Sequence, residues 1–271
     1  MTARRTRSEV MAQLAEGIAR LTSSDEWRRY LELQSRFHCY SFNNVLLIAA
    51  QCHEAIQVAG YGAWRKLNRF VRRGERAIWI LAPILERRLD TDDGADGDVV
   101  RGFRLVPVFD VSQTEGDELP SVCRRLAGDD PAGHYGRLVE LARSLGFAVE
   151  ECEFAGTMNG DCSHAARRIR IERRNTPSQR VKTLAHELAH ALLHESCEDR
   201  ALAELEAEST AYVVCGALGI DSGGYSFGYV AAWAGGGAEA LAGVRESGVR
   251  IQKAAAAILD SLESDAAVRA A

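Results

Sequence analysis

The stretch VKTLAHELAHALLHE, residues 181–195, carries the motif H-E-x-x-H as His186, Glu187 and His190. Positions i and i+4 of an α-helix lie one turn apart on the same face, so both imidazoles can bind one small ion. Zinc accepts nitrogen ligands at about 2.0–2.1 Å, and the glutamate between the histidines can reach a water on the metal. This pattern is typical of metal-dependent hydrolases in which the glutamate is the general base.

The residues around the motif predict that it lies on an amphipathic helix. Thr176, Pro177 and Gln179 form a capping-box sequence, with the proline at the first helical position. Leu184 and Leu188 recur at helical spacing, so another face of the helix is apolar. Buried histidine and glutamate cost free energy unless they are paired or bound to a metal, which favours a metal site over a chance match.

A second predicted helix, RALAELEAESTAYVVCGALGI at residues 200–220, supplies carboxylates. A zinc hydrolase needs a third protein ligand, and it also needs a carboxylate that orients a ligand imidazole. Glu204 and Glu208 lie one turn apart on one face, whereas Glu206 points elsewhere. We predict that Glu204 is the third ligand of Zn²⁺ and that Glu208 supports a ligand histidine. The reverse assignment is the alternative.

Spacing and composition argue against other ligands. His194 lies eight residues beyond His186, about 12 Å along a helix, and no glycine follows His190 to let the helix break. The seven cysteines are scattered and form no C-x-x-C pair. This distribution argues against a zinc held by thiolates, and it is typical of free thiols in a reducing cytoplasm.

The metal-binding segment resembles a known peptidase family. His186 to His190, followed by Glu204-x-x-Ala207, is similar to the ImmA/IrrE family of metallopeptidases within the gluzincin group. The stretch RRIRIE, residues 167–172, resembles the edge strand that lies beside the active-site cleft in that family. The resemblance implies a mostly helical, zincin-like metallopeptidase domain with a small antiparallel sheet.

Charge is distributed unevenly along the chain. Residues 1–88 carry 15 Lys and Arg against 8 Asp and Glu, a net charge of +7, and the remainder carries 18 against 30, a net charge of −12, which together give −5. A basic first third suggests that a polyanion binds the N-terminal part. Cations cluster in residues 65–76 among aromatic residues, a combination that single-strand binders use, although a basic helix face can also be merely solvated.

Short motifs in the N-terminal part resemble a second family. Helices are predicted over residues 8–22, 24–37, 42–52 and 65–73, and strands over 77–82 and 102–111. The motifs Trp27-x-x-Tyr30-Leu31, Phe37-His38-x-Tyr40-Ser41-Phe42-x-Asn44, Gly60-Tyr61-x-x-Trp64 and Val108-Phe109-Asp110-Val111-Ser112-Gln113-Thr114-Glu115 resemble the N-terminal domain of ArdC-like antirestriction proteins.

This resemblance covers about residues 10–116 and implies a single-stranded-DNA-binding domain fused to a zinc metallopeptidase-like domain, encoded on plasmids and other mobile elements. It does not identify the residues that contact DNA, so these are chosen by residue type. We expect phosphate contacts from Arg65, Lys66, Arg69, Arg72 and Arg73, base stacking on Tyr40 and Tyr61, and a core position for Trp64.

The predicted fold is α+β with two domains. A small α+β single-stranded-DNA-binding domain occupies residues 1–116, a linker rich in turn formers occupies 117–133, and the metallopeptidase domain occupies 134–271. No apolar run reaches 18 residues, so no membrane span is predicted.

The predicted function is that of a cytoplasmic antirestriction-type protein of a mobile element, which binds single-stranded DNA and cleaves a peptide or protein substrate with Glu187 as the base. Two alternatives remain. In the first, the chain binds single-stranded DNA and its zinc site is structural and proteolytically silent. In the second, the peptidase cleaves a repressor.

Overall fold

The computed structural model describes residues 5–88, 97–119, 133–196, 199–220, 227 and 237–269, and the chain divides into two compact units. The first unit consists of Met1–Gly17 and Asn43–Pro120, and the second of Ile18–Phe42 and Ser121–Ala271. The predicted boundary placed all of residues 1–116 in the first domain, whereas the structure assigns residues 18–42 to the second unit. Most of the predicted linker, residues 120–132, lies outside the described residues.

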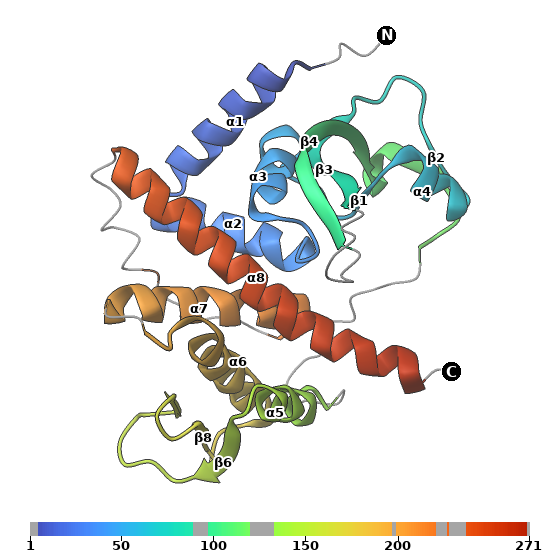
Figure 1. Cartoon of the computed structure of the whole chain (residues 1–271). Coiled ribbons are helices and arrows are strands. Elements are labelled where there is room, and N and C mark those ends of the chain that lie inside the picture. Colours follow the sequence, from blue (N-terminus) through green and yellow to red (C-terminus); the bar gives the residue numbers. More distant parts are fainter. Residues whose placement is uncertain are drawn as a thin grey trace. The chain divides into compact units, whose positions relative to one another are not determined.

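The first unit is built on a three-stranded antiparallel sheet with strand order β1-β4-β3 (Figure 1). A separate antiparallel pair joins β2 to β5. The elements are α1 (Arg7–Arg20, of which the part through Gly17 belongs to this unit), α3 (Phe42–Gln51), β1 (Val58–Ala59), α4 (Tyr61–Lys66), β2 (Arg69–Val71), β3 (Ile78–Arg88), β4 (Gly97–Asp110), a 3₁₀ turn (Val111–Gln113) and β5 (Thr114–Gly116).

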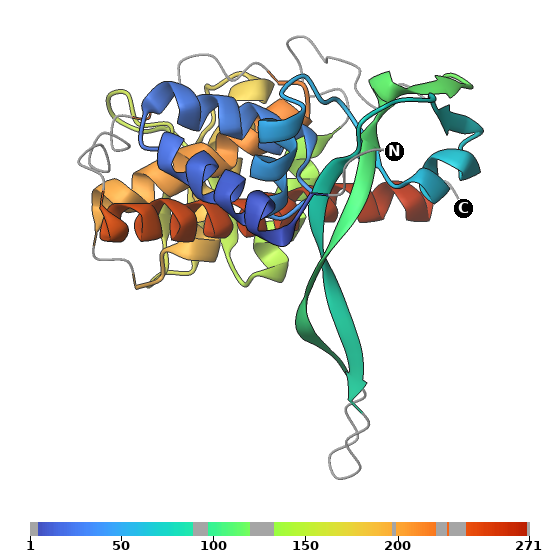
Figure 2. The same ribbon diagram turned by 90° about the horizontal axis from the view of Figure 1, so that it is seen from above.

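Strands β3 and β4 form a long ribbon that coils along its length (Figure 2). Two amide side chains of α3 complete the hydrogen bonding of β3. Asn44 donates to the carbonyl of Leu81 and accepts from its N–H, both at 2.9 Å, and Gln51 makes the same pair of bonds with Trp79, also at 2.9 Å. Asn44 and Gln51 are seven residues apart, so they share one face of α3 and dock this helix on the strand.

The predicted helix over residues 65–73 is wrong. Helix α4 ends at Lys66, and Asn68 adopts a left-handed conformation with φ 53°. Arg69 then begins β2, which pairs with β5 from 45 residues further along the chain, Val71 facing Thr114. This long-range pairing outweighs the local helical preference of the basic segment.

The second unit combines helices with a three-stranded sheet whose order is β6-β8-β7. β6 and β8 are parallel, whereas β7 and β8 are antiparallel. β8, the RRIRIE segment, is therefore the central strand and β7 is an edge, which corrects the expectation that residues 167–172 form the edge strand. The elements are α2 (Ser24–Arg36), α5 (His134–Ser144), β6 (Ala148–Cys152), β7 (Gly160–Ser163), β8 (Arg168–Glu172), α6 (Pro177–Leu193), α7 (Arg200–Ala217) and α8 (Ala238–Arg269).

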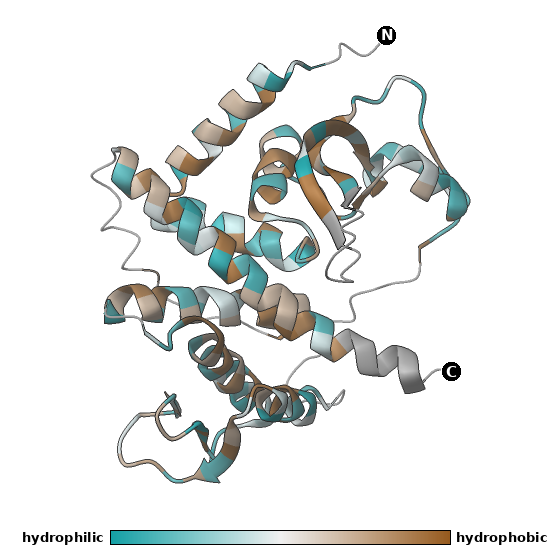
Figure 3. Cartoon of the chain, viewed as in Figure 1, coloured by the Kyte–Doolittle hydropathy of each residue, from teal (hydrophilic) through white to brown (hydrophobic). Residues whose placement is uncertain are grey.

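Helix α6 packs against α5, α7, α8 and the sheet of the second unit, and hydrophobic and polar residues alternate along it (Figure 3). Leu184 and Leu188 are fully buried, and α6 packs against α7. Helix α2 packs on α7 through a fully buried Trp27, whose indole N–H donates to Ser209 Oγ at 3.0 Å. This apolar face explains why residues 18–42 pack with the second unit.

The α+β fold class is confirmed, and none of the helices within the described ranges is long and apolar enough to cross a membrane.

Candidate metal centre and nucleic-acid-binding residues

Helix α6 presents the H-E-x-x-H motif from a well-capped start. Thr176 is the N-cap, and its hydroxyl accepts from the N–H of Gln179 at 3.3 Å, while Pro177 occupies the first turn. The Gln179 side chain donates to Thr183 Oγ1 instead of closing the capping box. The helix is unbroken through Leu193, so His186 and His190 lie one turn apart on one face.

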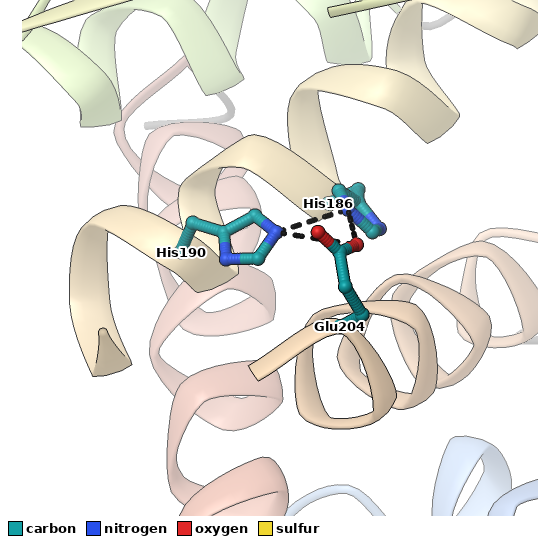
Figure 4. Close-up of side chains that lie close together, drawn as sticks. All are labelled: His186, His190 and Glu204. Carbon is teal, nitrogen blue, oxygen red and sulfur yellow. Dashed lines mark hydrogen bonds and ion pairs between the residues drawn. The ribbon is translucent and has the colours of Figure 1, made fainter. Parts of the chain in front are cut away.

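The two motif histidines and Glu204 of α7 converge on one point (Figure 4). The Nε2 atoms of His186 and His190 are 3.1 Å apart, and Glu204 Oε2 lies 3.4 Å from the first and 3.8 Å from the second. Ligands of a tetrahedral zinc at 2.0–2.1 Å lie about 3.3 Å from one another. Two imidazoles and a carboxylate at these separations therefore fit a divalent metal ion.

Glu208 contacts His186 at the ring nitrogen that does not face Glu204. Its Oε2 lies 3.3 Å from Nδ1 of His186, the ring nitrogen that faces away from His190. A metal-binding histidine commonly donates its second N–H to a carboxylate, which fixes the ring's orientation and tautomer. The structure thus places Glu204 at the converging Nε2 atoms and Glu208 on the outer side of His186.

Burial and neighbouring charges set the protonation of this group. Burial alone would lower the pKa of His186, but the carboxylates of Glu204 and Glu208 outweigh it and raise that pKa to about 9. The bond to His186 lowers the pKa of Glu204, while burial and the adjacent imidazoles lower the pKa of His190. A cation is thus favoured at the point where the three side chains meet.

Glu187 lies in the wall of a pocket beside the metal-binding group. It is 6% exposed, and burial raises its pKa to about 7. Gly160, at the start of the edge strand β7, leaves room for it, because a Cβ there would lie 2.9 Å from Glu187 Oε1. The pocket has a volume of about 280 Å³ and is lined by Asn159, Gly160, Gln179, Lys182, Thr183, His186, Glu187 and Glu208.

Sequence reasoning excluded His194 as a ligand and did not assign Glu206 a role. The structure places these two side chains together, with His194 Nε2 3.0 Å from Glu206 Oε2, and the second ring nitrogen of His194 touches His190. The signal in the sequence was the spacing of His186, His190 and His194, each one helical turn from the next.

The predicted DNA-contacting cations divide into two groups. Arg65, Lys66 and Arg73 are exposed. Arg69 donates from Nε to Thr114 Oγ1 at 2.8 Å and from its guanidinium to two backbone carbonyls of the β5 region. Arg72 is also exposed, but it pairs with Glu75 and donates to the carbonyl of Ser112 at 2.6 Å. Arg69 and Arg72 thus hold the first unit together.

The aromatic residues of the N-terminal part also divide into exposed rings and rings that pack inside a unit. Tyr61 is 51% exposed at the start of α4, and Phe70, which was not predicted as a contact, is 48% exposed on β2. Tyr40 is half-buried in the second unit, where it packs edge-to-face against Phe37. Trp64 is fully buried and donates to the carbonyl of Phe109 at 2.9 Å, so its predicted core position is confirmed.

Two family models match the chain. The model for the N-terminal domain of anti-restriction factor ArdC matches residues 3–114, and the model for the IrrE N-terminal-like domain matches residues 142–215. The first match includes residues 18–42, which pack in the second unit, so the family domain and the packing unit have different boundaries.

Solved and curated proteins resemble the chain at low identity. The Mn(II)-bound crystal structure of antirestriction ArdC protein from the R388 plasmid shares the fold, with a TM-score of 0.55, 19% identity, and coverage of 92% of this chain and 97% of that chain. Its metal-free structure matches with a TM-score of 0.49, 21% identity and coverage of 83% and 86%. An uncharacterized protein of Bacillus anthracis is 25% identical over 277 residues, which cover 83% of this chain, and the chain spans 46% of that relative's length.

Proposed function

We propose that this chain, whose two parts match the family models for the ArdC N-terminal domain and the IrrE N-terminal-like domain, is an antirestriction-type protein that binds single-stranded DNA and hydrolyses peptide bonds. The observation that carries the hydrolase half is the convergence of His186, His190 and Glu204 next to the buried Glu187. We assign the first three as ligands, Glu208 as the support of His186, and Zn²⁺ as the ion, because two imidazoles and one carboxylate are a common catalytic zinc set.

Glu187 has the properties of a general base. When bound, the ion supplies an activated water and polarises the scissile carbonyl. Burial holds the pKa of Glu187 near 7, so this carboxylate can take a proton at neutral pH and return it to the leaving amine. Its position in the pocket wall beside His186 supports this role.

We infer that an extended peptide pairs with β7. β7 is an edge strand of the second unit's sheet, and Gly160 at its start lies beside Glu187. Strand addition to a sheet edge uses the unpaired backbone groups of that strand, so the central strand β8 is not available for it. The pocket next to β7 is large enough to take one side chain of such a peptide.

The first test is Glu187→Gln in the full chain, with cleavage of a random peptide library measured by mass spectrometry and bound zinc by elemental analysis. The variant is expected to keep the metal and lose cleavage, because an amide cannot accept the proton. Glu195→Gln, an exposed position after α6, is the matched control and is expected to cleave like the wild type. Cleavage retained in Glu187→Gln would eliminate this residue as the base, whereas a wild type that binds zinc without cleaving any peptide would favour the silent, structural site.

The DNA-binding half rests on the exposed cations Arg65, Lys66 and Arg73 together with the exposed rings of Tyr61 and Phe70. All five lie within α4, β2 and the segment that follows β2. Cations neutralise phosphates and aromatic faces stack on bases without sequence preference, so this combination favours a single strand.

The second test replaces Arg65, Lys66 and Arg73 together with alanine and measures binding of a labelled oligothymidine by fluorescence anisotropy at several salt concentrations. Each lost phosphate contact on a single strand removes about 0.7 from the slope of log K against log salt, so the slope is expected to fall by about 2. Arg143→Ala on α5, an exposed arginine of the second unit, is the control. An unchanged slope would reject these cations as the contact surface.

A further inference from the structure

His190 is held at both of its ring nitrogens. Its Nε2 faces the metal-binding group, and its Nδ1 lies 2.9 Å from Nδ1 of His194. The other nitrogen of His194 lies 3.0 Å from Oε2 of Glu206, and a guanidinium nitrogen of Arg250 lies 3.0 Å from the same oxygen. A continuous row of polar contacts therefore runs from the candidate metal ligand through His194 and Glu206 to α8.

The central part of the row lies out of water, whereas the Arg250 side chain at its end is 40% exposed. The side chain of His194 is 4% exposed and that of Glu206 is fully buried. A buried carboxylate is unfavourable unless a countercharge and hydrogen bonds compensate it, and Arg250 supplies the countercharge here. Arg250 is itself anchored, because it also donates to the carbonyl of Leu193 at 3.0 Å.

The contacts set the positions of the protons. With the Glu206 carboxylate as acceptor, Nε2 of His194 carries a hydrogen, and in the neutral form of this ring Nδ1 carries a lone pair. That lone pair must face a donor, so Nδ1 of His190 carries the hydrogen between the two rings. Nε2 of His190 then presents a lone pair toward Glu204, and this is the tautomer that a metal ligand requires.

Both ligand histidines are thus supported by α7. Glu208 contacts His186 directly, at 3.3 Å, and Glu206 acts on His190 through the intervening ring of His194. His194 is the C-cap residue of α6, one turn beyond His190, which lets its ring reach both neighbours.

We infer that His194, anchored by Glu206 and Arg250, is a positioning residue that fixes the orientation and tautomer of the metal ligand His190. The inference rests on the proposed metal centre. It assigns functions to a histidine outside the H-E-x-x-H motif and to the acidic residue between Glu204 and Glu208. A purely structural role, as a buried ion pair between helices, would leave metal affinity unchanged as long as the variant folds.

The test measures Zn²⁺ affinity in the full chain by competition with a chromophoric chelator, alongside thermal unfolding of the metal-free protein. His194→Phe keeps the ring volume and removes both nitrogens. His194→Asn places a carbonyl oxygen near the position of Nδ1, so it restores the acceptor for His190 without the bond to Glu206. The matched control is His164→Phe, which removes a histidine whose Nε2 lies 3.0 Å from the backbone carbonyl of His190 and whose ring packs edge-to-face on Phe147.

His194→Phe is expected to bind zinc about 10- to 100-fold more weakly than the wild type, the range seen when such supporting contacts to a ligand are lost. His194→Asn is expected to recover part of this loss, and His164→Phe to bind like the wild type. Wild-type affinity in His194→Phe, no recovery in His194→Asn, or an equal loss in His164→Phe would each overturn the role. A wild type that binds no zinc would instead reject the metal centre itself, which separates the two failures.

Discussion

At the scale of single residues, Glu172 shows how a carboxylate can hold a loop beside the metal-binding unit. It accepts from the N–H of Phe154 at 2.8 Å and from the N–H of Arg174 at 2.9 Å, and it pairs with the Arg174 guanidinium. The Arg174 side chain first, and then the two backbone N–H groups, lower the pKa of Glu172 from 4.5 to about 2. The end of β8 is thereby tied to the segment after β6 and to the segment that leads to α6.

This network predicts a pH-dependent contribution to stability. Because the pKa of Glu172 is lower in the folded state than in the unfolded state, its stabilising effect is present above pH 4.5 and is lost as the pH falls from 4.5 toward 2. Glu172→Gln is therefore expected to unfold at lower urea concentration than the wild type at pH 7, and this difference should shrink at pH 3. Glu140→Gln on α5 is the exposed control. A difference of equal size at both pH values would contradict the prediction.

Helical spacing in the sequence predicted that His186 and His190 face the same point, and Glu204 was chosen because a zinc hydrolase needs a third protein ligand. The role of His194 was not predicted. Distance along a helix excludes it as a ligand of the same ion as His186, but says nothing about contact between neighbouring rings one turn apart. Glu206 was overlooked because its partner exists only once α6 and α7 pack together.

At the scale of elements, β2 illustrates a segment whose structure depends on a distant partner. Residues 65–73 are rich in arginine and read as a helix, yet the chain turns at Asn68 and pairs with β5. The periodicity of a short basic segment contains no information about a strand more than 40 residues away. The predicted helix start at Thr176, by contrast, was correct because capping involves only neighbouring residues.

Arg69 is expected to stabilise this strand pair and not to bind DNA. Its three hydrogen bonds to Thr114 and Asp117 hold β2 against β5. Arg69→Ala should lower the free energy of unfolding by about 1–2 kcal/mol, since several bonds of a charged donor are lost at a partly exposed site. Arg65→Ala, at an exposed position on α4, should change it by less than about 0.5 kcal/mol. Equal effects of the two substitutions on the thermal midpoint would refute the distinction.

At the scale of the whole molecule, each of the two packing units is built from two separate segments of the sequence. The chain contributes residues 1–17 to the first unit, then residues 18–42 to the second, and then returns to the first. The family model for the N-terminal domain nevertheless runs through all of these residues. A boundary placed in the turn-rich segment near residue 117 is reasonable from composition, but it separates α2 from the helix that buries it.

This arrangement predicts that residues 117–271 are an incomplete unit. Helix α2 contributes Trp27, Tyr30 and Leu31 to the core, each at most 3% exposed, and Trp27 also bonds to Ser209 of α7. Loss of one such large buried side chain costs about 3–5 kcal/mol, and the fragment lacks all three together. We expect the isolated fragment to unfold without a sharp transition in circular dichroism. A synthetic peptide of residues 18–42 should restore a cooperative transition, whereas the same peptide with Trp27→Ala should not. A fragment that unfolds cooperatively at the temperature of the second unit in the full chain, with no peptide added, would show that α2 is dispensable.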